Sequence, residues 1–192
     1  MQKIILASQS PRRKQLLEWA EVPFEIIVQS TDETYPADMA IHDVPVHIAL
    51  EKATVVQRQI KQSAIESASL PILAADTIVV LDNRIIGKPI DRADAIATLQ
   101  QLSGNHHKVI TGVAILHNHK QVTFYEITDV HFHPLSTSQI EDYVDKYKPY
   151  DKAGAYAIQE WIGVVGIKSI TGDFYNVMGL PVSRVVQALE KL

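Results

Sequence analysis

The most constraining feature of this sequence is the apolar run Ile72–Val80, which carries one carboxylate in its middle. A short run rich in valine, isoleucine and alanine is typical of a buried β-strand. A carboxylate at Asp76 is costly to bury there unless it is paired, bound to a metal or placed at the edge of a cleft. A structural aspartate that caps a turn is the alternative, but so apolar a strand does not favour a turn. We therefore expect Asp76 to act as a general base or a metal ligand.

Hydrophobic periodicity predicts strands and helices in alternation along the chain. The strands are expected at residues 3–7, 24–28, 70–81, 84–86, 109–116, 121–133 and 162–170. The helices are expected at residues 10–20, 45–67, 91–102, 136–146 and 181–189. A chain of 192 residues has room for one ordinary domain or for two small lobes that share a cleft. The pattern predicts a single α/β unit over residues 1–192, since no repeat or linker interrupts it.

Composition and charge exclude several classes of function. No apolar run reaches the roughly 18 residues of a membrane span, and no export signal opens the chain, so we expect a cytoplasmic protein without a membrane partner. The absence of cysteine excludes disulfides, thiolate zinc sites and cysteine nucleophiles. A net charge of −4 argues against a nucleic-acid partner, so any anionic ligand must meet a local cluster of cations.

Such a cluster stands near the start of the chain, at Ser10–Lys14. Ser10 is expected to cap a helix whose first turn holds Pro11, Arg12 and Arg13. The helix dipole favours acidic side chains in that turn, so two arginines there break a local rule. Such breaks are typical of functional sites.

Further polar residues extend this pattern. Lys52, Lys88 and Glu33 are each, taken alone, more simply solvated side chains. In combination with the two arginines, the lysines favour a phosphate ester or anhydride as substrate. The arginine guanidinium binds two phosphate oxygens at once, and a helix N-terminus adds backbone N–H donors. Glu33 is a candidate second carboxylate for a divalent metal.

Four histidines offer a different hypothesis, a zinc-like cluster on two paired strands. His131 and His133 are expected to lie opposite His106 and His107. A tetrahedral site needs several ligands that converge at once, so we expect instead that His107 packs or hydrogen-bonds in the loop at Ser103–Gly104.

Several motifs occur in an order that identifies a family. The first is Leu6–Leu17, and the others follow at Leu50–Ala53, Ala75–Val79, Gly87–Pro89, Leu102–Gly104, Asp151–Gln159 and Asn176–Pro181. Together they resemble the Maf family of nucleoside triphosphate pyrophosphatases over nearly the whole chain. The segments Lys152–Tyr156 and Ile158–Gln159 resemble the branch that acts on dTTP and UTP rather than the 7-methyl-GTP branch.

This resemblance implies a fold and an activity. The implied fold is mixed α/β, similar to that of inosine triphosphate pyrophosphatases, with a mixed sheet, flanking helices and two lobes around a central cleft. The implied reaction cleaves a nucleoside triphosphate to the monophosphate and pyrophosphate with a divalent cation, Mg²⁺ or Mn²⁺. Family members are often dimers, so the resemblance allows a homodimer, although no stripe of residues here specifies an interface.

The resemblance also implies roles for single residues. Asp76 matches the proton acceptor, and Arg12, Thr77 and Gln159 match positions tied to substrate choice. The remaining matches are polar residues that line the pocket, namely Ser8, Arg13, Glu33, Lys52 and Lys88. We expect Ser8, Arg13, Lys52 and Lys88 to bind phosphate, and Glu33 with Asp76 to hold the metal.

Two other classes of function stay open at this point. A nucleotidyltransferase would use the same cations but pass the nucleoside monophosphate to an acceptor. A regulatory protein that inhibits septum formation, the effect from which the family takes its name, would act by binding alone. Binding alone does not need a carboxylate within an apolar strand, so we rank the enzyme first.

Overall fold

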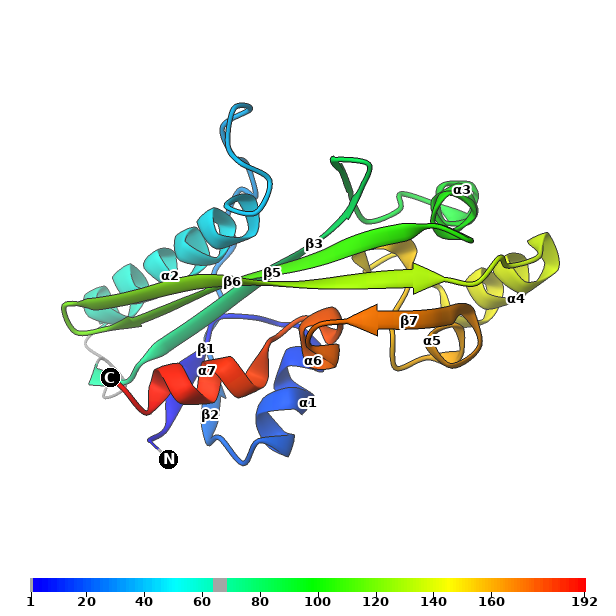
Figure 1. Cartoon of the computed structure of the whole chain (residues 1–192). Coiled ribbons are helices and arrows are strands. Elements are labelled where there is room, and N and C mark those ends of the chain that lie inside the picture. Colours follow the sequence, from blue (N-terminus) through cyan, green and yellow to red (C-terminus); the bar gives the residue numbers. More distant parts are fainter. Residues whose placement is uncertain (1, 64–68) are drawn as a thin grey trace. The chain divides into compact units, whose positions relative to one another are not determined.

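A computed structural model describes residues 2–63 and 69–192 (Figure 1). Its strands are β1 (Ile4–Leu6), β2 (Phe24–Ile26), β3 (Ile72–Leu81), β4 (Arg84–Ile86), β5 (His106–His117), β6 (Lys120–Phe132) and β7 (Ile167–Thr171). Its helices are α1 (Pro11–Trp19), α2 (Val44–Ser63), α3 (Arg92–Leu102), α4 (Thr137–Tyr147), the 3₁₀ helix η2 (Ala153–Ala155), α5 (Trp161–Gly166), α6 (Phe174–Met178) and α7 (Val182–Leu189).

The strands form one mixed sheet in the order β2-β1-β3-β5-β6-β7, with β4 paired to β3. Strand β1 runs parallel to β2 and to β3. The pairs β3–β4 and β6–β7 are antiparallel. Helices flank this sheet, so the predicted mixed α/β class is confirmed.

The chain divides into two compact units. The first contains the residues up to Asp76, with Thr111–Glu126 and Gly179–Leu192. The second contains Thr77–Ile110 and Ile127–Met178. The expected single domain and the cleft between two lobes stay predictions.

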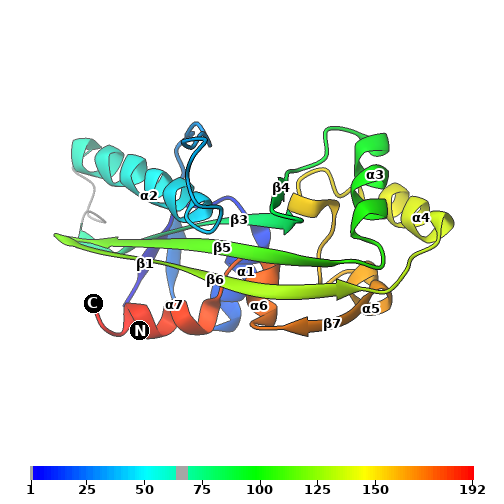
Figure 2. The same cartoon turned by 45° about the horizontal axis from the view of Figure 1, so that its top comes forward.

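In the first unit, α2 packs on one face of the sheet, and α1 and α7 lie on the other face (Figures 1 and 2). Small side chains make close packing possible where α2 meets the strands. The buried residues of this core are Ile5, Ala7, Ala49, Ala53, Val56, Ile60, Ile72, Ala74, Ala114 and Leu116. Gly112 of β5 lies directly against the first turn of α2: a Cβ there would stand 2.2 Å from the carbonyl carbon of Pro45.

In the second unit, α3 packs against α4 and η2. An aromatic cluster lies within this unit, where the His107 ring makes T-shaped contacts with Phe132 and Tyr156 at 5.2 and 5.5 Å between ring centroids. His107 Nε2 lies 2.7 Å from the Tyr156 hydroxyl. His107 therefore packs and forms a hydrogen bond, as expected. Its partner, however, is Tyr156 rather than the loop at Ser103–Gly104.

Capping residues and a tight turn define several of the observed boundaries, and the cap expected at Ser10 is confirmed. The Ser10 hydroxyl accepts from Arg13 N, Asp91 caps α3, and Ser136 with Gln139 forms a capping box on α4. Asp82 and Asn83 both adopt positive φ, of 50° and 59°, as a tight hairpin turn requires.

Two predicted boundaries differ from the structure or extend past it. The strand expected at residues 162–170 is wrong in its first part, because Trp161–Gly166 is helix α5 and only Ile167–Thr171 is a strand. A short apolar run suits a buried strand and a buried helical turn equally well, so periodicity alone did not decide between them. The helix expected over 45–67 is present to Ser63, and residues 64–67 lie outside the described residues. Within the two described ranges, no helix combines the length and the apolar character that crossing a membrane requires.

Candidate active site

Asp76 lies in the middle of β3, with its side chain 14% exposed. Its Oδ1 accepts a hydrogen bond from Lys52 Nζ at 2.8 Å. The same ammonium group lies 2.6 Å from Glu33 Oε1. One lysine therefore bridges two carboxylates, and it provides the pairing that a carboxylate in an apolar strand needs.

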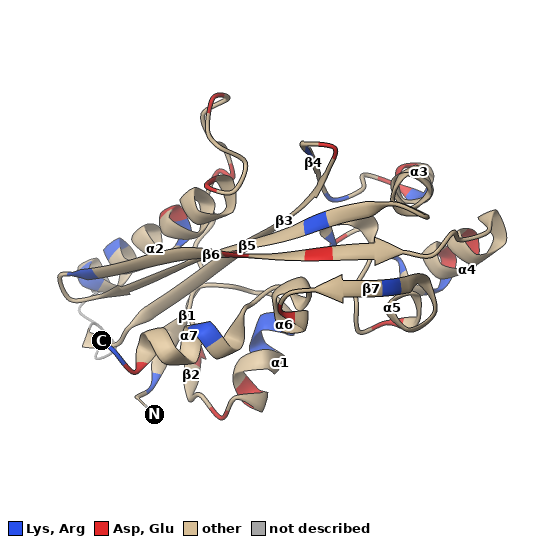
Figure 3. Cartoon of the chain, viewed as in Figure 1, with Lys and Arg blue, Asp and Glu red and all other residues tan. Residues whose placement is uncertain are grey.

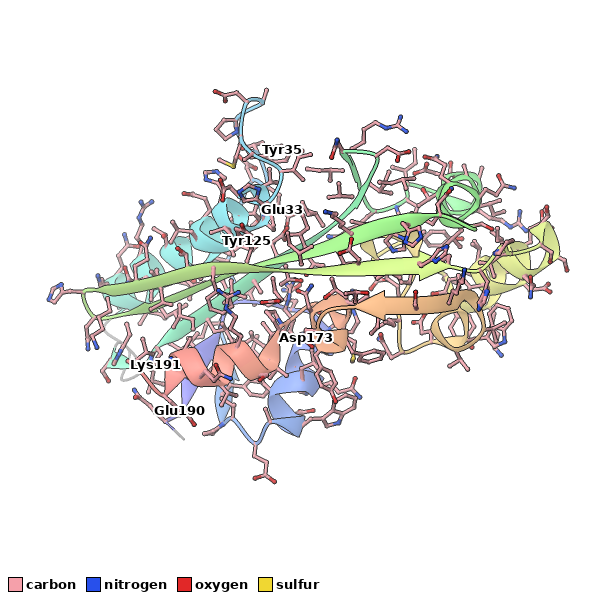
Figure 4. The ribbon with its side chains drawn as sticks, in the orientation of Figure 1. Glu33, Tyr35, Tyr125, Asp173, Glu190 and Lys191 are labelled. Carbon is pink, nitrogen blue, oxygen red and sulfur yellow. The ribbon has the colours of Figure 1, made fainter. Side chains whose placement is uncertain are left out.

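The packing of α2 explains how Lys52 reaches Asp76. Ala49, Ala53 and Val56 of α2 are buried against the sheet, so the helix lies close to β3. Lys52 stands between these positions at the margin of the buried face, and its side chain is 17% exposed. Its ammonium group reaches the two carboxylates from this position. Figure 4 shows Glu33 on the loop that leads from β2 into α2.

Arg13 forms the cationic part of the same unit. Its Nε donates to the Gly179 carbonyl oxygen at 2.8 Å, and its Nη1 donates to Ser8 Oγ at 3.1 Å. The Ser8 hydroxyl also accepts from the backbone N–H of Ser10 at 3.2 Å. These contacts fix a buried guanidinium at the N-terminus of α1, where Figure 3 shows the basic residues of that helix.

The charges around Arg13 oppose one another. Burial lowers the pKa of the Arg13 guanidinium, and the positive charge of Arg12 lowers it further. The carboxylates of Asp76 and Glu33 act against this and raise it. Arginine stays protonated under ordinary conditions, so the site holds a fixed positive charge beside two carboxylates. This arrangement fits an anionic ligand that arrives with a cation.

The carboxylates fit a divalent metal. Glu33 Oε1 and Asp76 Oδ1 both face the Lys52 ammonium nitrogen, so they converge on one cation position. Carboxylate oxygens are the donors that Mg²⁺ and Mn²⁺ prefer, and Mg²⁺ is commonly held by one or two carboxylates together with substrate phosphates and water. In the part of the chain that the structure describes, no group of three or more histidine, aspartate or glutamate side chains is placed to hold a metal.

The zinc-like histidine cluster is not formed among the described residues. His106 and His131 stack with their ring centroids 3.6 Å apart, an arrangement of two rings rather than of converging ring nitrogens. His107 is buried and bound to Tyr156.

The expected site residues divide between the two units. The first unit brings together Ser8, Arg12, Arg13, Glu33, Lys52 and Asp76. The second unit holds Thr77, Lys88 and Gln159. Their position relative to the residues of the first unit stays a prediction.

Within the second unit, Lys88 and Gln159 belong to segments near one another in the fold. Lys88 is exposed on the loop after β4, and the neighbouring Gly87 carbonyl oxygen accepts from Gly154 N at 3.1 Å. Gly154 belongs to η2, and Gln159 is exposed in the turn between η2 and α5.

Sequence reasoning missed a polar cluster under this turn, formed by Tyr143, Lys152 and Glu160. The Tyr143 hydroxyl donates to Glu160 Oε2, and Lys152 Nζ lies 3.6 Å from Glu160 Oε1. One signal was present, because Tyr143 stands beside Val144 and three residues after Ile140 on the apolar stripe of a predicted helix.

Comparisons with known proteins agree with the motifs. Residues 3–192 match the Maf family, described as Maf-like protein. The chain is 49% identical over 189 residues to a dTTP/UTP pyrophosphatase of Cytophaga hutchinsonii, covering 98% of this chain and 84% of that protein. It is 46% identical over 191 residues to a dTTP/UTP pyrophosphatase of Bacteroides thetaiotaomicron, and the match covers 99% of this chain and 96% of that protein. A dTTP/UTP pyrophosphatase of Bacillus anthracis is 48% identical over 191 residues, and the match covers 100% of this chain and 96% of that protein.

Among solved structures, the Ham1 protein of Staphylococcus aureus aligns with 68% of this chain and 71% of its own, with a TM-score of 0.45 and 11% identity.

Proposed function

The chain belongs to the Maf family, and we propose that it is a nucleoside triphosphate pyrophosphatase that hydrolyses dTTP and UTP to the monophosphate and pyrophosphate. Three relatives that are 46–49% identical over almost all of this chain are dTTP/UTP pyrophosphatases. The observation that carries the proposal is the convergence of Asp76 and Glu33 on one cation position. A fixed arginine beside these carboxylates suits a triphosphate that carries a divalent cation.

We assign Arg13, Lys52 and Lys88 to binding the triphosphate tail of the substrate. Arg13 is held in place by Gly179 and Ser8, so its guanidinium is preorganised before an anion arrives. Lys52 supplies a second positive charge, and Lys88 is assigned to the same tail. These groups offset the negative charge that builds up on the departing pyrophosphate.

Asp76 is assigned to the attacking water. Its Oδ1 faces the cation position, and Oδ2 is assigned to take the proton from a water that attacks the α-phosphorus. The bond from the α-phosphorus to the bridging oxygen then breaks, and pyrophosphate leaves with that oxygen. A divalent metal held by Glu33 and Asp76 would polarise the phosphate oxygens and neutralise charge.

Base choice is assigned to Gln159, with Arg12 and Thr77 as further contacts. The amide of Gln159 offers a donor and an acceptor, and the uracil or thymine edge offers an acceptor beside an N3–H. Gln159→Ala should reduce the preference for UTP over CTP more than it reduces the maximal rate of pyrophosphate release. An unchanged preference would refute this assignment.

The test of the activity is a panel of nucleoside triphosphates, modified bases included, assayed for pyrophosphate with Mg²⁺ and with Mn²⁺. We expect equal amounts of monophosphate and pyrophosphate, with dTTP and UTP as the preferred substrates. Pyrophosphate with the nucleotide attached to an acceptor would instead indicate a nucleotidyltransferase. No hydrolysis of any triphosphate would indicate a protein that acts by binding.

Three further features belong to the same proposal: the domain organisation, the location in the cell and the oligomeric state. Residues 1–192 act as a single Maf-like domain, because one family match covers 3–192. The protein acts in the cytoplasm, where its nucleotide substrates are made and used. A homodimer is proposed from the family resemblance alone, and sedimentation equilibrium should then give about twice the monomer mass of 21.4 kDa.

A further inference from the structure

Gln159 lies in a tight turn formed by residues 157–160, which we call the 157–160 turn. The backbone N–H of Glu160 donates to the Ala157 carbonyl oxygen at 3.1 Å and closes the turn. Ala157 and Ile158 are 4% and 5% exposed, whereas Gln159 is exposed. The first two residues of the turn are therefore buried, and the Gln159 side chain points to solvent.

One hydroxyl group joins the two ends of this turn. Tyr143 of α4 is 1% exposed, and its hydroxyl oxygen accepts from Ala157 N at 3.3 Å. The same hydroxyl donates its proton to Glu160 Oε2. Burial and the carboxylate of Glu160 raise the pKa of Tyr143, so the hydroxyl remains a donor at neutral pH.

Lys152 and Gly163 restrain the turn further. The Lys152 side chain is 9% exposed, and its Nζ lies 3.6 Å from Glu160 Oε1 and 2.8 Å from Asp151 Oδ1. This cation offsets the charge of the partly buried Glu160 carboxylate. Gly163 lies so close to the turn that a Cβ there would stand 1.7 Å from the Ile158 carbonyl oxygen. The backbone on the N-terminal side of Gln159 is therefore held against α5.

We propose that Tyr143 is a positioning residue for base discrimination, because its hydroxyl holds the 157–160 turn in the conformation that aims the Gln159 amide. This inference rests on the proposed function, in which Gln159 reads the base. A fixed amide can match the O4 acceptor and N3–H donor of uracil while mismatching the reversed pattern of cytosine. On a loosened turn the amide can take more positions, including ones that suit cytosine, so discrimination falls while hydrolysis continues.

Tyr143→Phe tests this directly, because it removes the hydroxyl and keeps the buried ring. We expect the ratio of kcat/KM for UTP over CTP to fall by about tenfold, the effect of one lost hydrogen bond on recognition. We expect kcat with UTP to change by less than about twofold, since the phosphate-binding groups are untouched. The matched control is Tyr147→Phe, a tyrosine on the same helix whose ring stacks on Tyr143 at 4.8 Å. It should keep the wild-type ratio.

The double variant Tyr143→Phe with Gln159→Ala shows whether Tyr143 acts through Gln159. We expect it to discriminate no worse than Gln159→Ala alone, because both changes disable one contact. Additive losses would overturn the inference. Hydrogen exchange adds a readout without substrate, in which the amide of Ala157 should exchange faster in Tyr143→Phe and at the wild-type rate in Tyr147→Phe.

The outcomes separate this inference from the proposed function. A wild-type protein that hydrolyses no nucleoside triphosphate would contradict the function itself. A wild-type protein that prefers UTP, loses that preference in Gln159→Ala and keeps it in Tyr143→Phe would overturn the inference alone. Should Tyr143→Phe fail to fold, Glu160→Ala removes one of the two contacts that this hydroxyl makes in the turn and should lower discrimination in the same direction.

Discussion

At the scale of single residues, the site depends on opposite charges that are only partly solvated. Lys52 neutralises two carboxylates at distances of 2.6 and 2.8 Å, and Arg13 is buried with its donors directed to Gly179 and Ser8. Removing either Lys52 or Asp76, whose side chains are 17% and 14% exposed, leaves the other uncompensated, which is more costly than the pairing is favourable. Each charged residue here therefore has a measurable consequence for its neighbours.

Lys52 occupies the cation position between Glu33 and Asp76, so it should compete with a divalent metal. We predict that Lys52→Met raises the Mn²⁺ affinity of the nucleotide-free protein by about tenfold, because two adjacent carboxylates without a counter-ion attract a metal more strongly. Titration calorimetry with Mn²⁺ measures this. Lys61→Met, an exposed change on the same helix, should leave the affinity unchanged. Equal affinities for wild type and Lys52→Met would contradict the shared cation position.

His107 should make stability depend on pH. Burial first, and then the charge of His106, lower the pKa of His107 to about 4. In the unfolded chain that pKa is about 6.5. Between these values the unfolded state binds more protons, so the free energy of unfolding should fall as pH drops from about 6.5 to about 4, by ~3 kcal/mol in all.

Urea unfolding at a series of pH values checks this dependence. His107→Phe should be less stable at pH 7, because the Tyr156 hydroxyl loses its partner, but its stability should vary less between pH 7 and pH 4. The exposed His119→Gln serves as the control and should keep the wild-type slope. A His107→Phe protein with that same slope would show that another group is responsible.

At the scale of elements, helix α2 determines where the site lies. Its buried alanines allow it to approach the sheet, and Gly112 allows β5 to lie against its first turn. Sequence periodicity predicted this helix over residues 45–67, and its buried face in the structure includes Ala49, Ala53 and Val56. It did not predict that Lys52 meets Glu33 as well as Asp76, because that contact depends on a loop whose path no local pattern specifies.

Gly112→Ala should therefore be strongly destabilising. The added Cβ would stand 2.2 Å from both the Pro45 carbonyl carbon and the Val46 nitrogen, and these are backbone atoms that move only with the helix. We predict that the free energy of unfolding falls by about 3 kcal/mol, measured by urea denaturation. Gly87→Ala is the control, since no atom beyond its two chain neighbours lies within 4 Å of its added Cβ. Similar stabilities of the two variants would contradict the close packing of β5 on α2.

Helix α5 could not be predicted from the local sequence pattern. The apolar residues from Ile162 onward suggested one strand, but Gly163 packs against the Ile158 carbonyl oxygen, and the Glu160 carbonyl oxygen accepts from Gly163 N. These contacts join a turn to a helix and depend on residues outside the run itself. The capping residues Ser10, Asp91 and Ser136 were predictable because each acts within four residues of its own position.

At the scale of the whole molecule, charge is distributed unevenly. The net charge is −4, yet the first unit gathers Arg12, Arg13 and Lys52 around two carboxylates. The sequence alone indicated a substrate with phosphates and a role for Asp76 as general base or metal ligand, since a carboxylate within an apolar strand has few explanations. The long-range partners of Arg13, above all the Gly179 carbonyl oxygen 166 residues away, became visible only in the fold.

The proposed function assigns the release of pyrophosphate from dTTP and UTP to Asp76. The most direct test is the rate of pyrophosphate release from UTP by Asp76→Asn, beside Asp82→Asn at the exposed hairpin turn of β3 and β4. We predict a loss of about a thousandfold for Asp76→Asn with an unchanged circular dichroism spectrum, and a wild-type rate for Asp82→Asn. A wild-type rate of pyrophosphate release from Asp76→Asn would contradict a role for Asp76 in the reaction.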